Sequence, residues 1–191
     1  MIIEIIDGIK YRLDEDELTA EVSKMMGYKG DIIIPETVVF NEVTYHVTSI
    51  GEKTFDECKN LTSIVIPDSV TSIGRAAFDE CSSLTSIIIP NSVTSIGMRA
   101  FSCCDSLESI TIPASVTSIG YQAFYGCDSL TKVIIPASVT SIEEEAFSYC
   151  DKLRTIRYGG TIAQWKEIAH VYSVIGCPTR VVRCTDGDVK L

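Results

Sequence analysis

The chain has 191 residues and a formal net charge of −10, with 46% hydrophobic and 22% charged residues. This length is typical of one domain, and the composition supplies a buried core and excludes a disordered chain. The acidic balance argues against a nucleic-acid surface and against attachment to an anionic membrane by charge alone, because both need clustered lysine and arginine.

The N-terminal segment does not have the pattern of a signal peptide. Residues 1–8 lack a basic first part and a long apolar centre, and Glu4 and Asp7 interrupt them. No apolar run approaches the roughly 20 residues of a membrane helix, so we expect no membrane insertion. The sequence leaves two origins open, a cytoplasmic chain and a mature form whose leader has been removed.

Residues 1–49 predict an N-terminal cap made of two hairpins. The strand-like residues 9–13 and 18–22 lie on either side of an acidic segment and predict the first hairpin. A degenerate repeat follows at residues 32–51, and its extra residues 39–45 predict the second hairpin. The cap would cover the open end of a sheet, which otherwise invites association with other chains.

The central part of the sequence repeats every 23 residues, with the unit L-x-x-I-x-I-P-x-S-V-T-S-I-G-x-x-A-F-x-x-C-x-x. A repeat of this length indicates a solenoid, in which stacked units bury a face that one unit cannot bury alone. The aromatic and cysteine columns of the repeat are Phe55, Phe78, Phe101, Phe124 and Phe147, and Cys58, Cys81, Cys104, Cys127 and Cys150.

One unit shows how the repeat is expected to fold. Residues 84–89 have the β-branched composition of a strand, and Pro90 ends it by removing a backbone donor. Residues 93–96 predict a second short strand. Gly97 would permit a turn with positive φ. Residues 100–104 predict a short helical or 3-10 turn, with phenylalanine and cysteine one turn apart.

Residues 159–191 predict a C-terminal cap. Residues 161–169 form an amphipathic helix pattern with Thr161 as the N-cap, and residues 180–184 predict a final strand. Trp165 on this helix has two interpretations, a ring that stacks on a ligand or a plug against the last repeat. The plug is favoured.

The unit resembles the BspA-like leucine-rich repeats, a bacterial and protozoan class. Residues 84–107, LTSIIIPNSVTSIGMRAFSCCDSL, read like a consensus of that family. The resemblance implies a leucine-rich-repeat solenoid: a right-handed coil of short β-strands in a parallel ladder, with short helical or 3-10 turns and a cap at each end. It divides one continuous domain into a hairpin cap with a degenerate repeat (1–49), the 23-residue repeats (50–158) and a helix–strand cap (159–191).

The residues suggest no catalytic, cofactor or metal site. His46 and His170 lie in opposite caps, and the sequence carries no catalytic triad, metalloprotease, phosphate-loop or dinucleotide motif. The acidic residues 14–17 and 186–188 lack the spacing of a calcium loop, which favours solvated charge.

The cysteine column has three interpretations. Zinc is disfavoured by the absence of a CxxC pair, and disulfides by the parallel Cβ directions of the column. A row of buried, reduced thiols is favoured. Cys103 lies outside the column and should be more exposed. Cys177 and Cys184 flank a turn and are the pair expected to bond in an oxidising compartment.

The outward positions of the first strand form the candidate binding site. They place β-branched apolar residues in one row, which is more than solubility requires. Serine and threonine fill the neighbouring columns, and arginines lie at the C-terminal end. The candidate ligand-binding residues are Val65, Ile88, Thr111, Ile134, Arg154 and Arg157.

A second patch is expected on the turn side, where Tyr121, Tyr125 and Tyr149 cluster. Tyrosine combines apolar area with a polar tip and suits a binding patch, but ordinary surface packing is favoured.

These observations predict a non-enzymatic module that binds a protein or a glycan. The resemblance implies adhesion or recognition at the surface of a bacterial cell or in a secreted form, although a cytoplasmic location stays open. The alternative is a structural module that self-associates weakly through its exposed strands.

Overall fold

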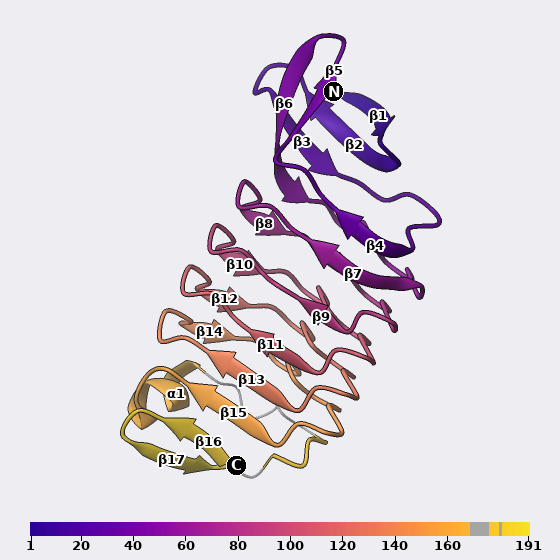
Figure 1. The fold of residues 1–191 in the computed structure, drawn as a ribbon. Coiled ribbons are helices and arrows are strands. Elements are labelled where there is room, and N and C mark those ends of the chain that lie inside the picture. Colours follow the sequence, from indigo (N-terminus) through magenta and orange to yellow (C-terminus); the bar gives the residue numbers. More distant parts are fainter. Residues whose placement is uncertain (169–175, 180) are drawn as a thin grey trace.

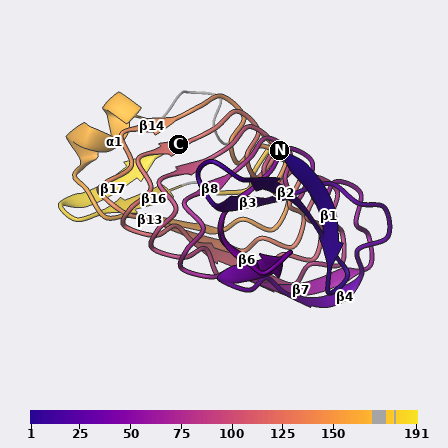
Figure 2. The same cartoon turned by 90° about the horizontal axis from the view of Figure 1, so that it is seen from above.

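The computed structural model describes residues 1–168, 176–179 and 181–191, and over them the chain coils into a stack of similar units (Figure 1). Seen from above, the successive coils overlie one another (Figure 2). Each unit contributes one strand to a first ladder, a two-residue strand to a second ladder, and a turn that closes the coil. The predicted solenoid is therefore confirmed.

The first ladder is built from the L-x-x-I-x-I segments, and we call its outward surface the ladder face. Leucine and isoleucine point inward from it and are buried. Its strands pair in parallel except at the last hairpin, and they separate into two sheets between β9 and β11. In stack order they are β4 (Gly30–Ile33), β7 (Leu61–Val65), β9 (Ser86–Ile87), β11 (Ser109–Thr111), β13 (Lys132–Ile135), β15 (Thr155–Tyr158), β16 (Val181–Cys184) and β17 (Gly187–Lys190).

The second ladder repeats in register with the sequence, since Ser95 pairs with Ser118 and Ile96 with Ile119. It continues the sheet of the N-terminal cap. The cap strands are β1 (Ile2–Ile6), β2 (Ile9–Asp14), β3 (Thr19–Val22), β5 (Thr37–Phe40) and β6 (Val43–Ile50); the repeat strands are β8 (Ser72–Ile73), β10 (Ser95–Ile96), β12 (Ser118–Ile119) and β14 (Ser141–Ile142).

The closing segments are turns and not the short helices predicted from the sequence. In the unit that begins at residue 84, Arg99 and Cys103 have φ of 55° and 53°. These values lie in the left-handed region, which a right-handed helix excludes. This conformation directs alternate N–H groups toward the next unit. Arg99 N donates to Tyr121 O at 2.9 Å, and Cys103 N donates to Tyr125 O at 2.7 Å. The turns thus form a third ladder of hydrogen bonds, on a surface that we call the turn face.

Gly97 is needed for a different reason from the one predicted. Its φ lies outside the left-handed region, but a Cβ added to it would lie 2.9 Å from the carbonyl carbon of Gly74. The backbones of neighbouring units therefore approach so closely at this column that a side chain on Gly97 would displace one of them.

The core behind the turns is a stack of aromatic rings beside a row of thiols. The rings of Phe78 and Phe101 lie 5.2 Å apart and 3° from parallel, and the other column members stack in the same way. Each thiol after the first donates to the phenylalanine carbonyl of the preceding unit, as Cys104 Sγ does to Phe78 O at 3.2 Å. All five column cysteines are buried and free, as predicted.

Cys177 and Cys184, the pair expected to bond in an oxidising compartment, are both free thiols in this structure. Cys177 is buried and donates to Phe147 O at 2.7 Å, so it is the sixth member of the thiol row. The insertion of four residues relative to the 23-residue step hid it from the repeat pattern. Cys103 is half-buried and thus more exposed than Cys104, as expected.

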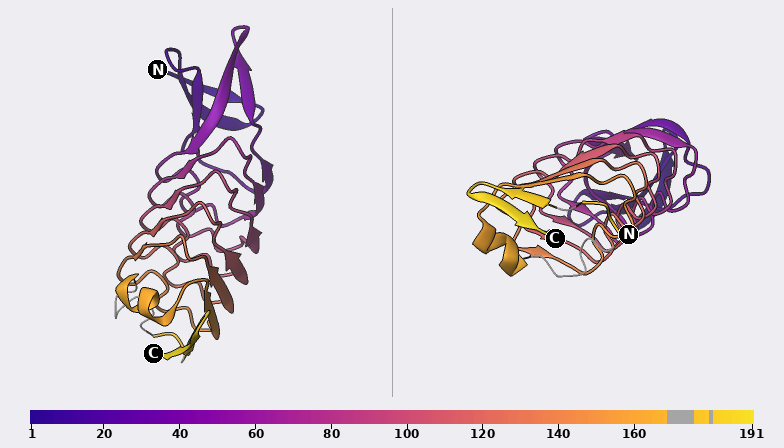
Figure 3. Two further views of the ribbon diagram at one scale, coloured as in Figure 1. Left: turned by 90° about the vertical axis from the view of Figure 1, so that its left-hand side faces the viewer. Right: turned by 90° about the horizontal axis from the view of Figure 1, so that it is seen from below.

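The N-terminal cap contains both predicted hairpins, β2–β3 and β5–β6. The β5–β6 hairpin projects beyond the stack (Figures 1 and 3) and turns at Asn41 and Glu42, whose φ values of 49° and 64° are those of a type I′ turn. The edge strand β1 was not predicted. It pairs antiparallel with β2.

The C-terminal cap begins with α1 (Ile162–Ile168). Thr161 N donates to Gln164 Oε1 and Gln164 N to Thr161 Oγ1, which confirms Thr161 as the N-cap through a reciprocal capping box. Trp165 is 3% exposed, with its ring 5.5 Å from that of Tyr158, so it is the predicted plug. Residue 169 of the predicted helix and residue 180 of the predicted final strand lie outside the described residues. The last strand of the hairpin, β17, was not predicted. No helix among the described residues is long and apolar enough to cross a membrane.

Candidate ligand-binding face

The predicted row lies outward on neighbouring strands. Thr111 pairs with Ile134, and Ile134 with Arg157, so register alone places these side chains side by side. Val65 is 55% exposed and Ile88 is 83% exposed, whereas Ile134 is half-buried. The register therefore places Thr111, Ile134 and Arg157 in one row. Val65 and Ile88 continue this row on the strands of the neighbouring sheet, and Arg154 lies in an adjacent outward column.

The row extends into both caps, where sequence reasoning missed it. Ile33 pairs with Val65 and is 71% exposed, and Arg183 pairs with Arg157. Both lie where the 23-residue step is broken, so counting columns could not reach them. The triplet of isoleucines before Pro35 repeats the I-x-I-P motif and would have identified Ile33.

A hollow of about 340 Å³ opens on the ladder face where β9 and β11 separate. Residues from both strands line it, with Ile88 on the side of β9 and Thr111 on the side of β11. The lining residues are Ser86, Ile87, Ile88, Ile89, Asn91, Ser109, Thr111 and Pro113.

The hydroxyl columns differ along the stack. Near the N-terminal cap Thr62 Oγ1 and Ser63 Oγ both donate to Asp31 Oδ1, at 2.8 and 2.7 Å. These hydrogen bonds stabilise the carboxylate and lower the pKa of Asp31. Further along, Ser86 and Ser109 are exposed beside the hollow. Polar groups available to a ligand therefore lie in the middle of the face.

Four cations gather at the C-terminal end of the ladder face, and we call Lys132, Arg154, Arg157 and Arg183 the basic corner. Arg154 Nη1 donates to Asp151 O at 3.0 Å. Among the described residues, none of the four forms an ion pair. Unpaired arginines on a chain of net charge −10 indicate a surface that attracts anionic groups.

The tyrosines of the turn face are engaged within the protein. Tyr121 Oη donates to Glu145 Oε2 at 3.3 Å, and the rings of Tyr125 and Tyr149 lie 5.2 Å apart. Tyr149 is 48% exposed but lies against Gly176 of the C-terminal cap. These contacts favour the interpretation of the cluster as surface packing.

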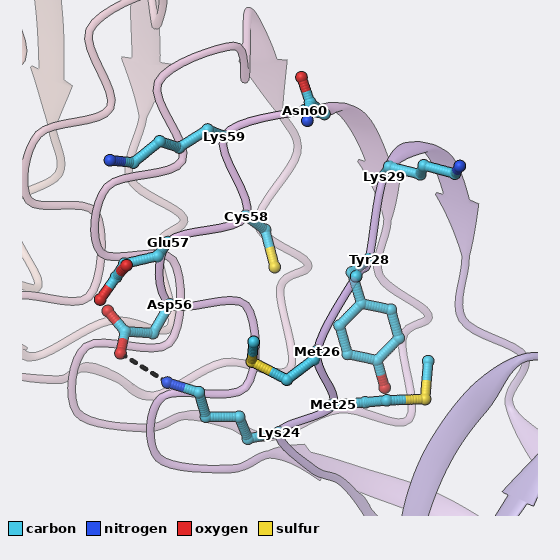
Figure 4. Close-up of a pocket in the computed structure, with 11 residues that line it drawn as sticks. Lys24, Met25, Met26, Tyr28, Lys29, Asp56, Glu57, Cys58, Lys59 and Asn60 are labelled. Atoms are coloured by element: carbon cyan, nitrogen blue, oxygen red, sulfur yellow. Dashed lines mark hydrogen bonds and ion pairs between the residues drawn. The ribbon is translucent and has the colours of Figure 1, made fainter.

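A larger hollow lies away from the predicted row, between the N-terminal cap and the first turn, with a volume of about 600 Å³. Figure 4 shows the sulfur of Cys58 pointing into it and Lys24 closing one side through its 2.8 Å ion pair with Asp56. Burial raises the pKa of the Cys58 thiol, which keeps it protonated and unreactive. Sequence reasoning gave no sign of this hollow, because it results from the fit between the cap and the first unit.

The family model of the BspA type leucine-rich repeat region matches residues 48–174 in six copies. The chain belongs to this family. A search of curated proteins gave no match. This BspA-type repeat protein is similar to several solved structures of bacterial leucine-rich repeat proteins, and the comparisons indicate no catalytic family.

Three of these structures show how far the likeness extends. A leucine-rich repeat protein from Bacteroides ovatus is 35% identical, with a TM-score of 0.64 over 81% of this chain and 46% of that chain. A leucine rich cell surface protein from Faecalibacterium prausnitzii is 30% identical, with a TM-score of 0.57 over 83% and 55%. Pneumococcal vaccine antigen PcpA, 22% identical with a TM-score of 0.72 over 97% and 50%, shares the fold. The chain spans about half the length of these proteins.

The described part of the BspA-type chain holds no group of three or more histidine, cysteine, aspartate or glutamate side chains arranged for a metal ion. Of the two histidines, His46 is exposed on β6, and His170 lies outside the described residues. Asp186, one of the acidic residues considered for calcium, accepts a hydrogen bond from Ile162 N and caps α1.

Proposed function

We propose that the protein is a non-enzymatic binding module that docks a protein or a glycan on its ladder face. The observation that carries the proposal is the outward row from Ile33 to Arg183, which runs over both sheets of the ladder face and is apolar for most of its length and basic at its end. Exposed apolar rows favour association, so a soluble acidic chain that keeps one has a use for it. Family membership supports a binding role, since repeat proteins of this kind are commonly surface or binding modules.

The proposal is tested by capture from bacterial and host surface extracts on the immobilised protein. Ile88→Glu combined with Ile134→Glu should abolish capture, because two carboxylates would interrupt the apolar row. Met98→Glu is the matched control: Met98 is an exposed apolar residue, 40% exposed, that lies off the row. Undiminished capture by the double variant, with the fold intact by circular dichroism, would exclude the ladder face.

A second candidate, self-association through the same face, is favoured by the distribution of charge. Asp31 lies at one end of the ladder face and the basic corner at the other. Two copies that meet through their ladder faces in antiparallel orientation would therefore pair opposite charges. Sedimentation over a range of concentrations separates the two candidates. A monomer throughout supports an external ligand, and a dimer that dissociates in the Ile88→Glu, Ile134→Glu variant supports self-association.

A further inference from the structure

We infer that the ligand presents an extended protein segment to the ladder face, with an aliphatic side chain in the hollow between β9 and β11 and a carboxylate at the basic corner. This inference rests on the proposed function and narrows its ligand to one class. It follows from the shape of the hollow, the charges around the corner and the distance between the two.

The hollow suits an aliphatic anchor. Ile88 projects beside it with 83% of its surface exposed, and the backbones of β9 and β11 separate to leave about 340 Å³ between them. Ser86 and Ser109 border it and offer hydroxyls to the backbone of an entering segment. An apolar side chain would cover Ile88 and remove both apolar surfaces from water.

The corner suits one or two carboxylates and disfavours a long polyanion. Arg157 and Arg183 are neighbours on paired strands, and each guanidinium can bind a carboxylate through two parallel hydrogen bonds. Acidic residues border the corner on both sides: Asp188 faces Arg183 on β17, and Glu108 precedes β11. A sulfated glycan crossing the corner would meet both, whereas a short acidic segment would not.

The outward columns also lack the rings that sugars stack on. The three columns of the repeat strands hold serine, threonine, isoleucine, valine, lysine, arginine and one glutamate, and no aromatic residue. A protein segment needs no such ring, because it can offer its own apolar side chains to the row. The two observations together favour protein over glycan.

The strand spacing fixes the separation of the two contacts. Three strand steps lead from the hollow, between β9 and β11, to the midpoint of β15 and β16. At about 4.8 Å a step, this is roughly 14 Å, which an extended chain covers in about four residues. The ligand segment should therefore carry its acidic residue about four positions from its aliphatic anchor, in one chain direction.

The test is a set of blocked synthetic peptides in which one leucine and a pair of glutamates are separated by one to eight serine and threonine residues, made in both orders. Binding to the whole protein is followed by fluorescence polarisation, with glutamine in place of glutamate as the uncharged control. We expect the tightest binding at a separation of about four residues in one order, and at least a tenfold loss with glutamine. Equal binding at all separations, equal binding of the glutamine series, or no binding at millimolar peptide would overturn the inference.

Variants locate the two contacts. Arg157→Gln with Arg183→Gln should remove the preference for glutamate, and Ile88→Ser the preference for leucine, while Arg75→Gln on the turn face should change neither. Tighter binding of a heparin oligosaccharide than of any peptide would overturn the choice of protein. If the peptides fail while Ile88→Glu, Ile134→Glu still abolishes capture from extracts, the inference is wrong and the proposed function stands.

Discussion

The turn face and the ladder face of the same coil use their polar groups in opposite ways. On the turn face, neighbouring units are joined by ion pairs such as Arg99 with Asp79 at 3.0 Å, and Glu145 accepts hydrogen bonds from Tyr121 and Gln122. On the ladder face, the basic corner forms no ion pair among the described residues, and Ile88 stands in solvent.

This difference separates stability from binding within one repeat. The turn face covers the phenylalanine and cysteine rows, and its charged side chains pair between units. Packing therefore limits which residues this face can carry. The outward columns of the ladder face carry little of the core, so their residues can change without loss of the fold. Changes of pH and of single residues on each face test this division.

Alkaline pH should destabilise the protein through the thiol row behind the turn face. Burial raises the pKa of Cys81, Cys104 and Cys127, whereas an unfolded thiol has a pKa of about 8.5. A raised folded pKa gives stability that is present below pH about 8.5 and is lost as pH rises above it. One pH unit higher, a thiol that stays protonated in the fold costs about 1.4 kcal/mol, so the four thiols whose pKa is strongly raised, Cys81, Cys104, Cys150 and Cys177, should together cost roughly 5–6 kcal/mol.

Urea unfolding between pH 7.5 and 9.5 measures this loss. The Cys104→Ala, Cys127→Ala variant should start less stable and lose less stability over the same interval, because two buried thiols are absent. A stability that is flat with pH, or rapid alkylation of the buried column cysteines in the native protein at pH 8, would contradict the buried row.

Phe101→Ala should remove about 3–5 kcal/mol from the free energy of unfolding, as large-to-small changes in a tight core do. Its ring is fully buried and stacks on Phe78 and Phe124 at 5.2 and 5.3 Å, so the cavity would break the aromatic column in its middle. Chemical denaturation gives the value. A loss below 1 kcal/mol would show that the units stack without the column.

Gly97→Ala should cost about 1–3 kcal/mol, the usual penalty of overpacking, because the new methyl group would meet the backbone of Gly74. Glu143 occupies the same column in the last unit. If the substitution left the unfolding midpoint unchanged, the backbone of every unit could make room for a side chain at this column, as the last unit does for Glu143. The close approach of neighbouring backbones would then not be the reason for glycine at this position.

Ser109→Ala and Thr111→Ala should each change stability by less than about 0.5 kcal/mol, since both side chains are exposed on the ladder face. The same denaturation experiment provides the comparison with Phe101→Ala. A loss equal to that of the core variant would reverse the assignment of inward and outward columns.

The repeat was sufficient to predict the inward and outward columns, because equivalent positions of successive units lie in the same environment and carry the same kind of side chain. It could not predict the local backbone. The turn at Arg99 and Cys103 takes left-handed conformations that neither residue type signals, and the role of Gly97 depends on a neighbouring unit. Cys177 and Arg183 join their columns from the C-terminal cap through irregular spacing, which only the fold reveals. Ile33 also breaks the 23-residue step, but the motif before Pro35 carried a signal for it.

The hollow at the ladder face could not be predicted from the sequence for a related reason. The segments of β9 and β11 follow the same pattern as their neighbours, yet their strands do not pair in one sheet. The regular spacing of the repeat therefore gave no sign of the hollow. The basic corner, in contrast, was visible in part, because Arg154 and Arg157 fall in regular columns.

Hydroxyl-radical footprinting of the protein, free and bound to a captured ligand, identifies the face that binds. We expect binding to protect the side chains of Ile88, Val65 and Ile134 on the ladder face. Met98 and Tyr149, exposed by 40% and 48% away from it, should be oxidised equally in both states. Protection of Tyr149 together with unchanged oxidation of Ile88 would contradict the account and place the binding site on the turn face.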